Sequence, residues 1–65
     1  MDDLTTHSVT IPDRYNVQRE LRAHFLTNEV ALSLHNIPAG LMVDGMFGRD
    51  QIRDLRDHFT RWLGE

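Results

Sequence analysis

The chain has 65 residues, a formal net charge of −3 with neutral histidines, and no cysteine. It therefore holds one small domain and can form neither disulfides nor thiolate metal sites, so a partner is the remaining means of compensating for a marginal core. The acidic balance disfavours nucleic acid as the main partner, because neutralising phosphates needs clustered positive charge, and no apolar run approaches the roughly 20 residues of a membrane span.

The N-terminus predicts a disordered lead over residues 1–6, followed by a short strand. The first ten residues are polar and acidic, and they lack the basic start and apolar run of a secretion signal, so we expect a cytoplasmic protein. From His7 the sequence alternates, with Val9 and Ile11 on one side, as in a short strand. Pro12 ends this strand because it has no N–H to donate.

The next segment predicts a helix over residues 13–26. Asp13 is a suitable N-cap. Val17, Leu21 and Phe25 recur at i, i+4 and i+8, which gives a narrow apolar stripe. The residues QRELRA within this segment also have good helix propensity. This is the first of two helices expected before the C-terminal one.

A second helix is predicted over residues 29–36, where Val30, Ala31 and Leu34 share a face. Every second residue of the same segment is also apolar. The segment could therefore instead be a strand that pairs with residues 20–26 across a Thr-Asn turn. We take the helix as the prediction and keep the strand pair as the alternative.

The stretch NIPAGLMVDGMFG, residues 36–48, is rich in turn residues and yet apolar. Its three glycines and one proline are typical of a loop. Leu41 and Val43 would share one side of an extended chain, so a short strand also fits there. In a chain this small, a connecting segment with so many apolar residues must either complete the core or contact a partner.

The last segment predicts a C-terminal amphipathic helix. Apolar residues recur there with spacings of three, four and three, which places them on one face. Asp50 in the first turn and Arg61 in the last both suit the helix dipole, and Gly64 is a suitable stop. The apolar stripe consists of Ile52, Leu55, Phe59, Trp62 and Leu63.

Together these elements predict a mainly α fold, in a single small globular domain over residues 7–65. It would contain a short N-terminal strand, two helices, the apolar turn-rich segment with its possible short strand, and the C-terminal amphipathic helix. The alternative is an α+β fold in which a β-meander packs on the C-terminal helix.

No pattern in the sequence indicates catalysis, a cofactor or a metal. The carboxylates of the last helix alternate with arginines on its polar side, which is typical of a solvated, ion-paired face. Neither a GxSxG nucleophile motif nor a phosphate-binding glycine loop is present. We therefore expect a non-catalytic protein without cofactor. We also expect no metal, since no two histidines have the spacing of a helical metal site: His7, His24, His35 and His58.

Three short motifs resemble parts of known families, and none covers enough of the chain to assign it. LTNEVALSLHNIP, residues 26–38, resembles the first half of an excisionase-type helix-turn-helix. HSVTIPDRY, residues 7–15, resembles the opening strand of a ribbon-helix-helix repressor. VDGMFG, residues 43–48, is similar to a turn of peptidoglycan-binding modules. The resemblances imply two alternatives, a peptidoglycan-binding module and a small DNA-binding regulator, the latter with phosphate contacts from Arg14, Arg19 and Arg22.

The function that the sequence favours is protein–protein interaction, as an adaptor, an inhibitor or an assembly component, and we expect a homo-oligomer. The reasons are the small core and the apolar, methionine-bearing segment, since exposed methionines suit adaptable binding surfaces. Arginines beside that segment would form a polar rim, because Met, Arg and aromatic residues are enriched in interfaces. The expected interface residues are Leu41, Met42, Met46, Phe47 and Trp62, with Arg49, Arg53 and Arg56 at the rim.

Overall fold

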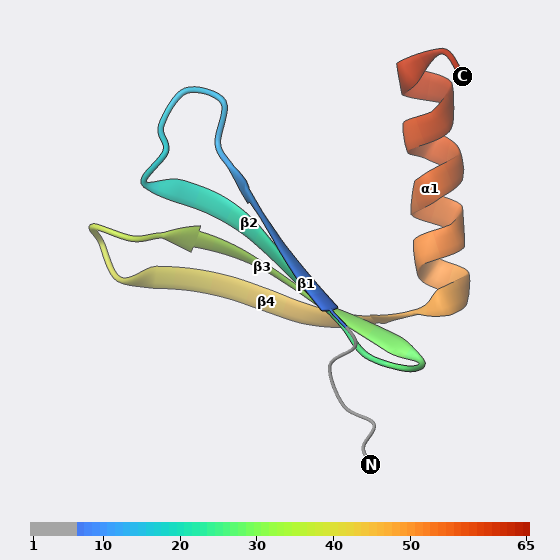
Figure 1. Ribbon diagram of the computed structural model, residues 1–65, viewed down its shortest axis with the longest axis horizontal. Helices are drawn as coiled ribbons and strands as arrows, with labels where there is room; N and C mark the ends of the chain where they lie inside the picture. The colour runs from blue at the N-terminus through green and yellow to red at the C-terminus, as the bar shows by residue number, and fades with distance from the viewer. Residues whose placement is uncertain (1–6) are drawn as a thin grey trace.

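The computed structural model describes residues 7–65, which form a four-stranded antiparallel sheet followed by one helix (Figure 1). Each strand pairs with the next one along the chain, so the sheet is a meander in the order β1-β2-β3-β4. The predicted lead over residues 1–6 lies outside the described residues. The elements are β1 (His7–Pro12), β2 (Arg19–Phe25), β3 (Glu29–Asn36), β4 (Leu41–Gly48) and α1 (Arg49–Leu63).

The fold is mainly β, so the prediction of a mainly α domain is wrong. Two predicted elements are confirmed, the strand that begins at His7 and the C-terminal helix. β1 lies at an edge of the sheet, where Pro12 is tolerated at the end of the strand. α1 ends at the left-handed Gly64, whose N–H donates to the carbonyls of Thr60 and Arg61.

The helix predicted over residues 13–26 is absent, and a loop and β2 take its place. Asp13 does not cap a helix, because its carboxylate accepts the N–H of Tyr15 at 2.9 Å and closes a local turn. Asn16 closes a second such turn, because its Oδ1 accepts the N–H of Gln18 at 2.9 Å. Aspartate and asparagine favour these turns because their short side chains reach the backbone two residues on.

The helix predicted over residues 29–36 is also wrong, and the strand pair kept as the alternative is the structure. Leu21 faces Leu34, and Phe25 faces Val30, in the antiparallel register of β2 and β3. The connecting turn is closed by the Leu26 N–H, which donates to the Glu29 carbonyl at 2.8 Å.

The turn-rich segment is a strand over most of its length. Only residues 37–40 form a turn, and β4 follows directly. The turn is closed by the Gly40 N–H, which donates to the Ile37 carbonyl at 3.1 Å, and Gly40 has a φ of 65°. The many apolar residues of this segment are therefore those of a sheet strand.

The hydrophobic core of the chain is very small. Within residues 7–65 the buried apolar residues are Ala23 and Val30, each 4% exposed, and no side chain is fully buried. The helix contributes little, because α1 leaves the end of β4 and stands away from the sheet (Figure 1), with its contacts mainly to β4. The α+β alternative expected the meander to pack on the C-terminal helix, and in the structure it does not.

Candidate interaction surface

One face of the sheet is mostly apolar. Alternate residues of a strand point to opposite faces, and paired residues share a face. The strand register assigns fifteen positions to this face, of which one end row holds Arg19, Asn36 and Leu41, and the other twelve include no Asp, Glu or Arg. We call these twelve positions the apolar sheet face. Its three cross-strand rows are His7, Phe25, Val30 and Phe47; then Val9, Ala23, Leu32 and Gly45; then Ile11, Leu21, Leu34 and Val43.

The apolar sheet face is poorly covered, especially in the row farthest from the helix. Leu34 is 62% exposed there and Val43 is 74% exposed. An antiparallel sheet normally packs one face against a second layer. Within residues 7–65, no second layer lies over this row. The sheet therefore presents a face built for burial that the described residues do not bury.

The helix presents a matching apolar stripe, which we call the helix stripe: Ile52, Leu55, Phe59, Trp62 and Leu63. Ile52, in the turn next to the sheet, is half-buried. Exposure is larger further along the helix, where Phe59 is 55% exposed and Trp62 is 83% exposed. A helix that packs in its own domain buries such a stripe, so α1 carries a second surface suited to burial.

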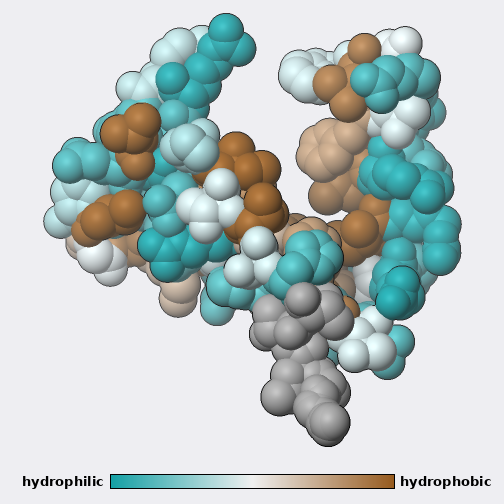
Figure 2. Space-filling model, viewed as in Figure 1, coloured by the Kyte–Doolittle hydropathy of each residue, from teal (hydrophilic) through white to brown (hydrophobic). Residues whose placement is uncertain are grey.

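The two surfaces line one groove. Figure 2 shows apolar residues on both sides of the hollow between the sheet and the helix. At its base lies a cleft of about 390 Å³, lined by Phe25 and Phe47 from the sheet and by Ile52 from the helix. The Phe25 ring stacks on His7 there, with ring centroids 4.4 Å apart. The helix stripe and the apolar sheet face thus meet at the base of the groove, whereas the third row of the sheet face, with Leu34 and Val43, lines a second hollow that no helix residue lines.

The junction between β4 and α1 holds the groove open. Gly48 is both the last residue of β4 and the N-cap of α1, so no loop separates the two elements. The Gly48 N–H donates to Gln51 Oε1 at 2.9 Å. Arg49 Nη2 donates to the Thr27 carbonyl at 2.7 Å, which fixes the start of the helix to the β2–β3 turn.

The structure divides the predicted interface residues between the two faces of the sheet. Leu41 and Phe47 lie on the apolar side of β4, whereas Met42 and Met46 point to the opposite side. All four are exposed. Trp62 lies in the helix stripe, and the three predicted rim arginines, Arg49, Arg53 and Arg56, line the cleft at the base of the groove.

Sequence reasoning missed most of the apolar sheet face. Its strongly exposed residues, such as Ile11, Leu34 and Val43, come from three strands and meet only through the register. The usable signal was period-two alternation of apolar residues in three successive segments. Each of those segments also fitted another interpretation, so the shared face was not recognised.

The opposite face of the sheet is polar. Ser33 is buried at its centre, and its Oγ lies 2.8 Å from Nε2 of His35 on the same strand. On β2, Arg22 forms an ion pair with Glu20. Partnered polar side chains of this kind suit a face turned to water.

The arginines of the DNA-binding alternative are not gathered on one surface. Arg14 lies in the β1–β2 loop. Arg19 and Arg22 point to opposite sides of β2. Nη2 of Arg19 lies 3.9 Å from Oδ2 of Asp13, and Arg22 forms an ion pair with Glu20. The described residues also contain one helix, whereas a helix-turn-helix and a ribbon-helix-helix need two each.

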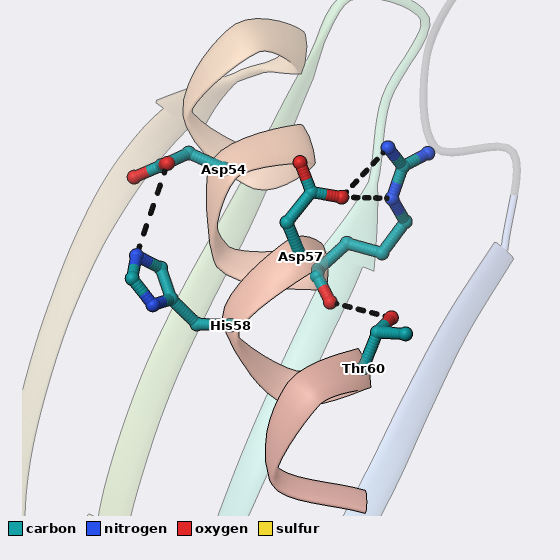
Figure 3. Close-up of polar contacts among 5 residues, drawn as sticks. Asp54, Asp57, His58 and Thr60 are labelled. Carbon is teal, nitrogen blue, oxygen red and sulfur yellow. Dashed lines mark hydrogen bonds and ion pairs between the residues drawn. The ribbon is translucent and has the colours of Figure 1, made fainter. Parts of the chain in front are cut away.

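The motif VDGMFG lies within β4 rather than in a turn. The four histidines lie on four different elements, and residues 7–65 hold no group of three His, Cys, Asp or Glu placed to bind a metal ion. The polar side of α1 carries surface ion pairs (Figure 3). Nη2 of Arg56 lies 2.9 Å from Oδ1 of Asp57, and Nε2 of His58 lies 3.9 Å from Oδ1 of Asp54. This arrangement is that of a solvated face.

In the part of the chain that the structure describes, α1 lacks the length and the apolar character that a membrane-spanning helix needs. The chain matches no protein-family model, no curated protein and no solved structure. The groove and its two apolar walls are the features of the described residues that indicate a function.

Proposed function

We propose that the protein is a non-catalytic protein–protein interaction module, an adaptor, inhibitor or assembly component. Its partner would cover the apolar sheet face and the helix stripe. One observation carries the proposal: two exposed apolar surfaces, one on the sheet and one on the helix, line the same groove. Soluble monomers rarely expose contiguous apolar surfaces of this kind, which mark interaction sites.

The chemistry of the groove indicates the kind of partner. Its walls carry aliphatic and aromatic side chains and no Asp, Glu or Arg in the three sheet rows. Such walls bind apolar protein surface rather than phosphate. Arg49, Arg53 and Arg56 at the base supply the polar edge that interfaces commonly have. Because the chain has no cysteine, a reducing cytoplasmic location suits it.

Site-specific photo-crosslinking tests this function. A photoreactive phenylalanine analogue would replace Leu34 in one variant and Phe59 in a second, with the protein produced in the cells that naturally make it. We expect both positions to crosslink to protein. The control carries the same group at Met46, which is also exposed but lies on the polar face of the sheet. Equal crosslinking from all three positions, or none from any, would refute the proposal.

A further inference from the structure

We propose that the partner is a second copy of the chain. The two copies exchange helices, so that the helix stripe of each chain covers the apolar sheet face of the other. This inference rests on the proposed function, because it names the partner of the same surface.

The chain carries both halves of a two-layer core. An apolar sheet face needs a layer with an apolar stripe, and an amphipathic helix is the commonest such layer. The helix stripe in turn needs an apolar face to pack against. Neither the stripe nor the three sheet rows contains Asp, Glu or Arg. The two surfaces are therefore complementary to each other in kind and in charge.

The two halves cannot meet within one chain as the junction is built. A helix that folds back over its own sheet needs a connecting loop, and α1 begins directly after β4. The hydrogen bond from Arg49 to Thr27 further fixes the direction in which the helix leaves the sheet. Within residues 7–65, the helix of the same chain therefore does not supply the sheet's second layer, and a helix from another chain can.

The small hydrophobic core explains why the partner would be a second copy of the chain. With Ala23 and Val30 as the buried apolar residues of the described part, the chain has little core to hold it folded. It needs its partner whenever it is folded, and a second copy is present wherever the chain is made. Obligate homodimers often have no stable folded monomer.

Symmetry agrees with this arrangement. Each copy offers one sheet face and one helix, so a two-fold pair uses both surfaces of both chains and leaves none open.

Sedimentation equilibrium of the purified chain over a wide concentration range is the first test, and we expect a dimer. Val43→Asp damages the sheet face, and Phe59→Asp damages the helix stripe. Each should weaken dimerisation by about 100-fold or more, because it buries an unpaired charge. The matched control is Met42→Asp, which adds the same charge one residue away on the polar face and should leave the dimer intact.

Mixing the two damaged variants tests the exchange itself. In a helix-exchanged heterodimer, the intact helix of the Val43→Asp chain meets the intact sheet of the Phe59→Asp chain, so one of the two contacts is restored. We expect the mixture to dimerise when neither variant does alone. Both substitutions add negative charge, so electrostatic attraction cannot produce this rescue. Circular dichroism of the mixture extends the test to variants that are unfolded alone, because rescue then appears as regained structure.

Two outcomes would overturn the inference. A wild-type dimer whose damaged variants do not rescue each other would show that like surfaces, not exchanged ones, form the contact. A wild-type monomer at every concentration would exclude self-association. In that case the crosslinking above separates the two proposals: capture of a different protein from Leu34 and Phe59 preserves the interaction module, whereas no capture removes it as well.

Discussion

The ring of Phe47 lies against Gly45, two residues earlier on the apolar side of β4. A Cβ added at Gly45 would lie 3.1 Å from two carbons of that ring, closer than ordinary van der Waals contact. Gly45 sits opposite Leu32 in the central row of the sheet. The missing side chain therefore lets the aromatic ring lie along its own strand at the side of the groove.

Gly45→Ala should consequently depend on Phe47. Alanine in a strand normally stabilises relative to glycine by about 0.5–1 kcal/mol, because glycine loses more backbone freedom on folding. Here crowding against the ring should cancel that gain. In a Phe47→Ala background the ring is gone, and the same change should stabilise the protein.

Urea denaturation of the four proteins at one concentration measures this coupling. We expect an interaction free energy of about 1 kcal/mol between the two positions. An identical effect of Gly45→Ala in both backgrounds would show that the ring moves away without cost.

The elements that the sequence predicted correctly are those with a single periodicity. The spacings of three, four and three from Ile52 to Trp62 fit only a helix, and α1 is there. The spacing of four between Leu21 and Phe25 fits a helix but also two steps of a strand. The decision between the two comes from pairing with a neighbouring strand, which a local pattern does not contain.

The candidate site was predictable in part for the same reason. The helix stripe follows from the sequence alone, whereas the apolar sheet face depends on the register of three strand pairs. Met42 and Met46 illustrate the point. They were grouped with Leu41 and Phe47 by proximity in sequence, but a strand sends neighbouring residues to opposite faces, and β4 divides the group accordingly.

Gly40 should be sensitive to substitution for a purely conformational reason. Its φ of 65° lies in the left-handed region, and an added Cβ would meet nothing within 4 Å. Gly40→Ala should destabilise the protein by about 1 kcal/mol. Gly40→Asn should cost less, because asparagine tolerates this region better. Thermal unfolding at fixed concentration compares the two, and equal losses would argue against a backbone origin.

Trp62 should report the covering of the helix stripe. It is the only tryptophan of the chain and is 83% exposed. If a second chain covers the helix stripe, the fluorescence of Trp62 should move to shorter wavelength as protein concentration rises. Acrylamide should also quench the Trp62 fluorescence less at high protein concentration.

The control for this measurement places the indole on the polar side of the same helix, in a Trp62→Phe, Asp57→Trp variant. Its emission should stay that of a water-exposed indole at every concentration. If the emission wavelength changed with concentration in the control but not in the wild type, the contact would lie on the polar side of α1 and not on the helix stripe.

Arg49 should set the direction of the helix relative to the sheet. Its guanidinium donates to the Thr27 carbonyl at 2.7 Å, across 22 residues of sequence. Arg49→Met keeps most of the apolar stem and removes this donor, and we expect a loss of about 1 kcal/mol, because the contact is exposed. Hydrogen exchange at the backbone amides of the β2–β3 turn should also become faster.

Arg53→Met is the matched variant, because it removes the same charge one turn along α1 and leaves the contact with Thr27 in place. It should leave the exchange rates of the turn unchanged. Arg49→Lys should recover part of the stability, since an ammonium group can also donate to a carbonyl. If Arg49→Met and Arg53→Met had equal effects on stability and exchange, the charge near the cleft would matter and the specific hydrogen bond would not.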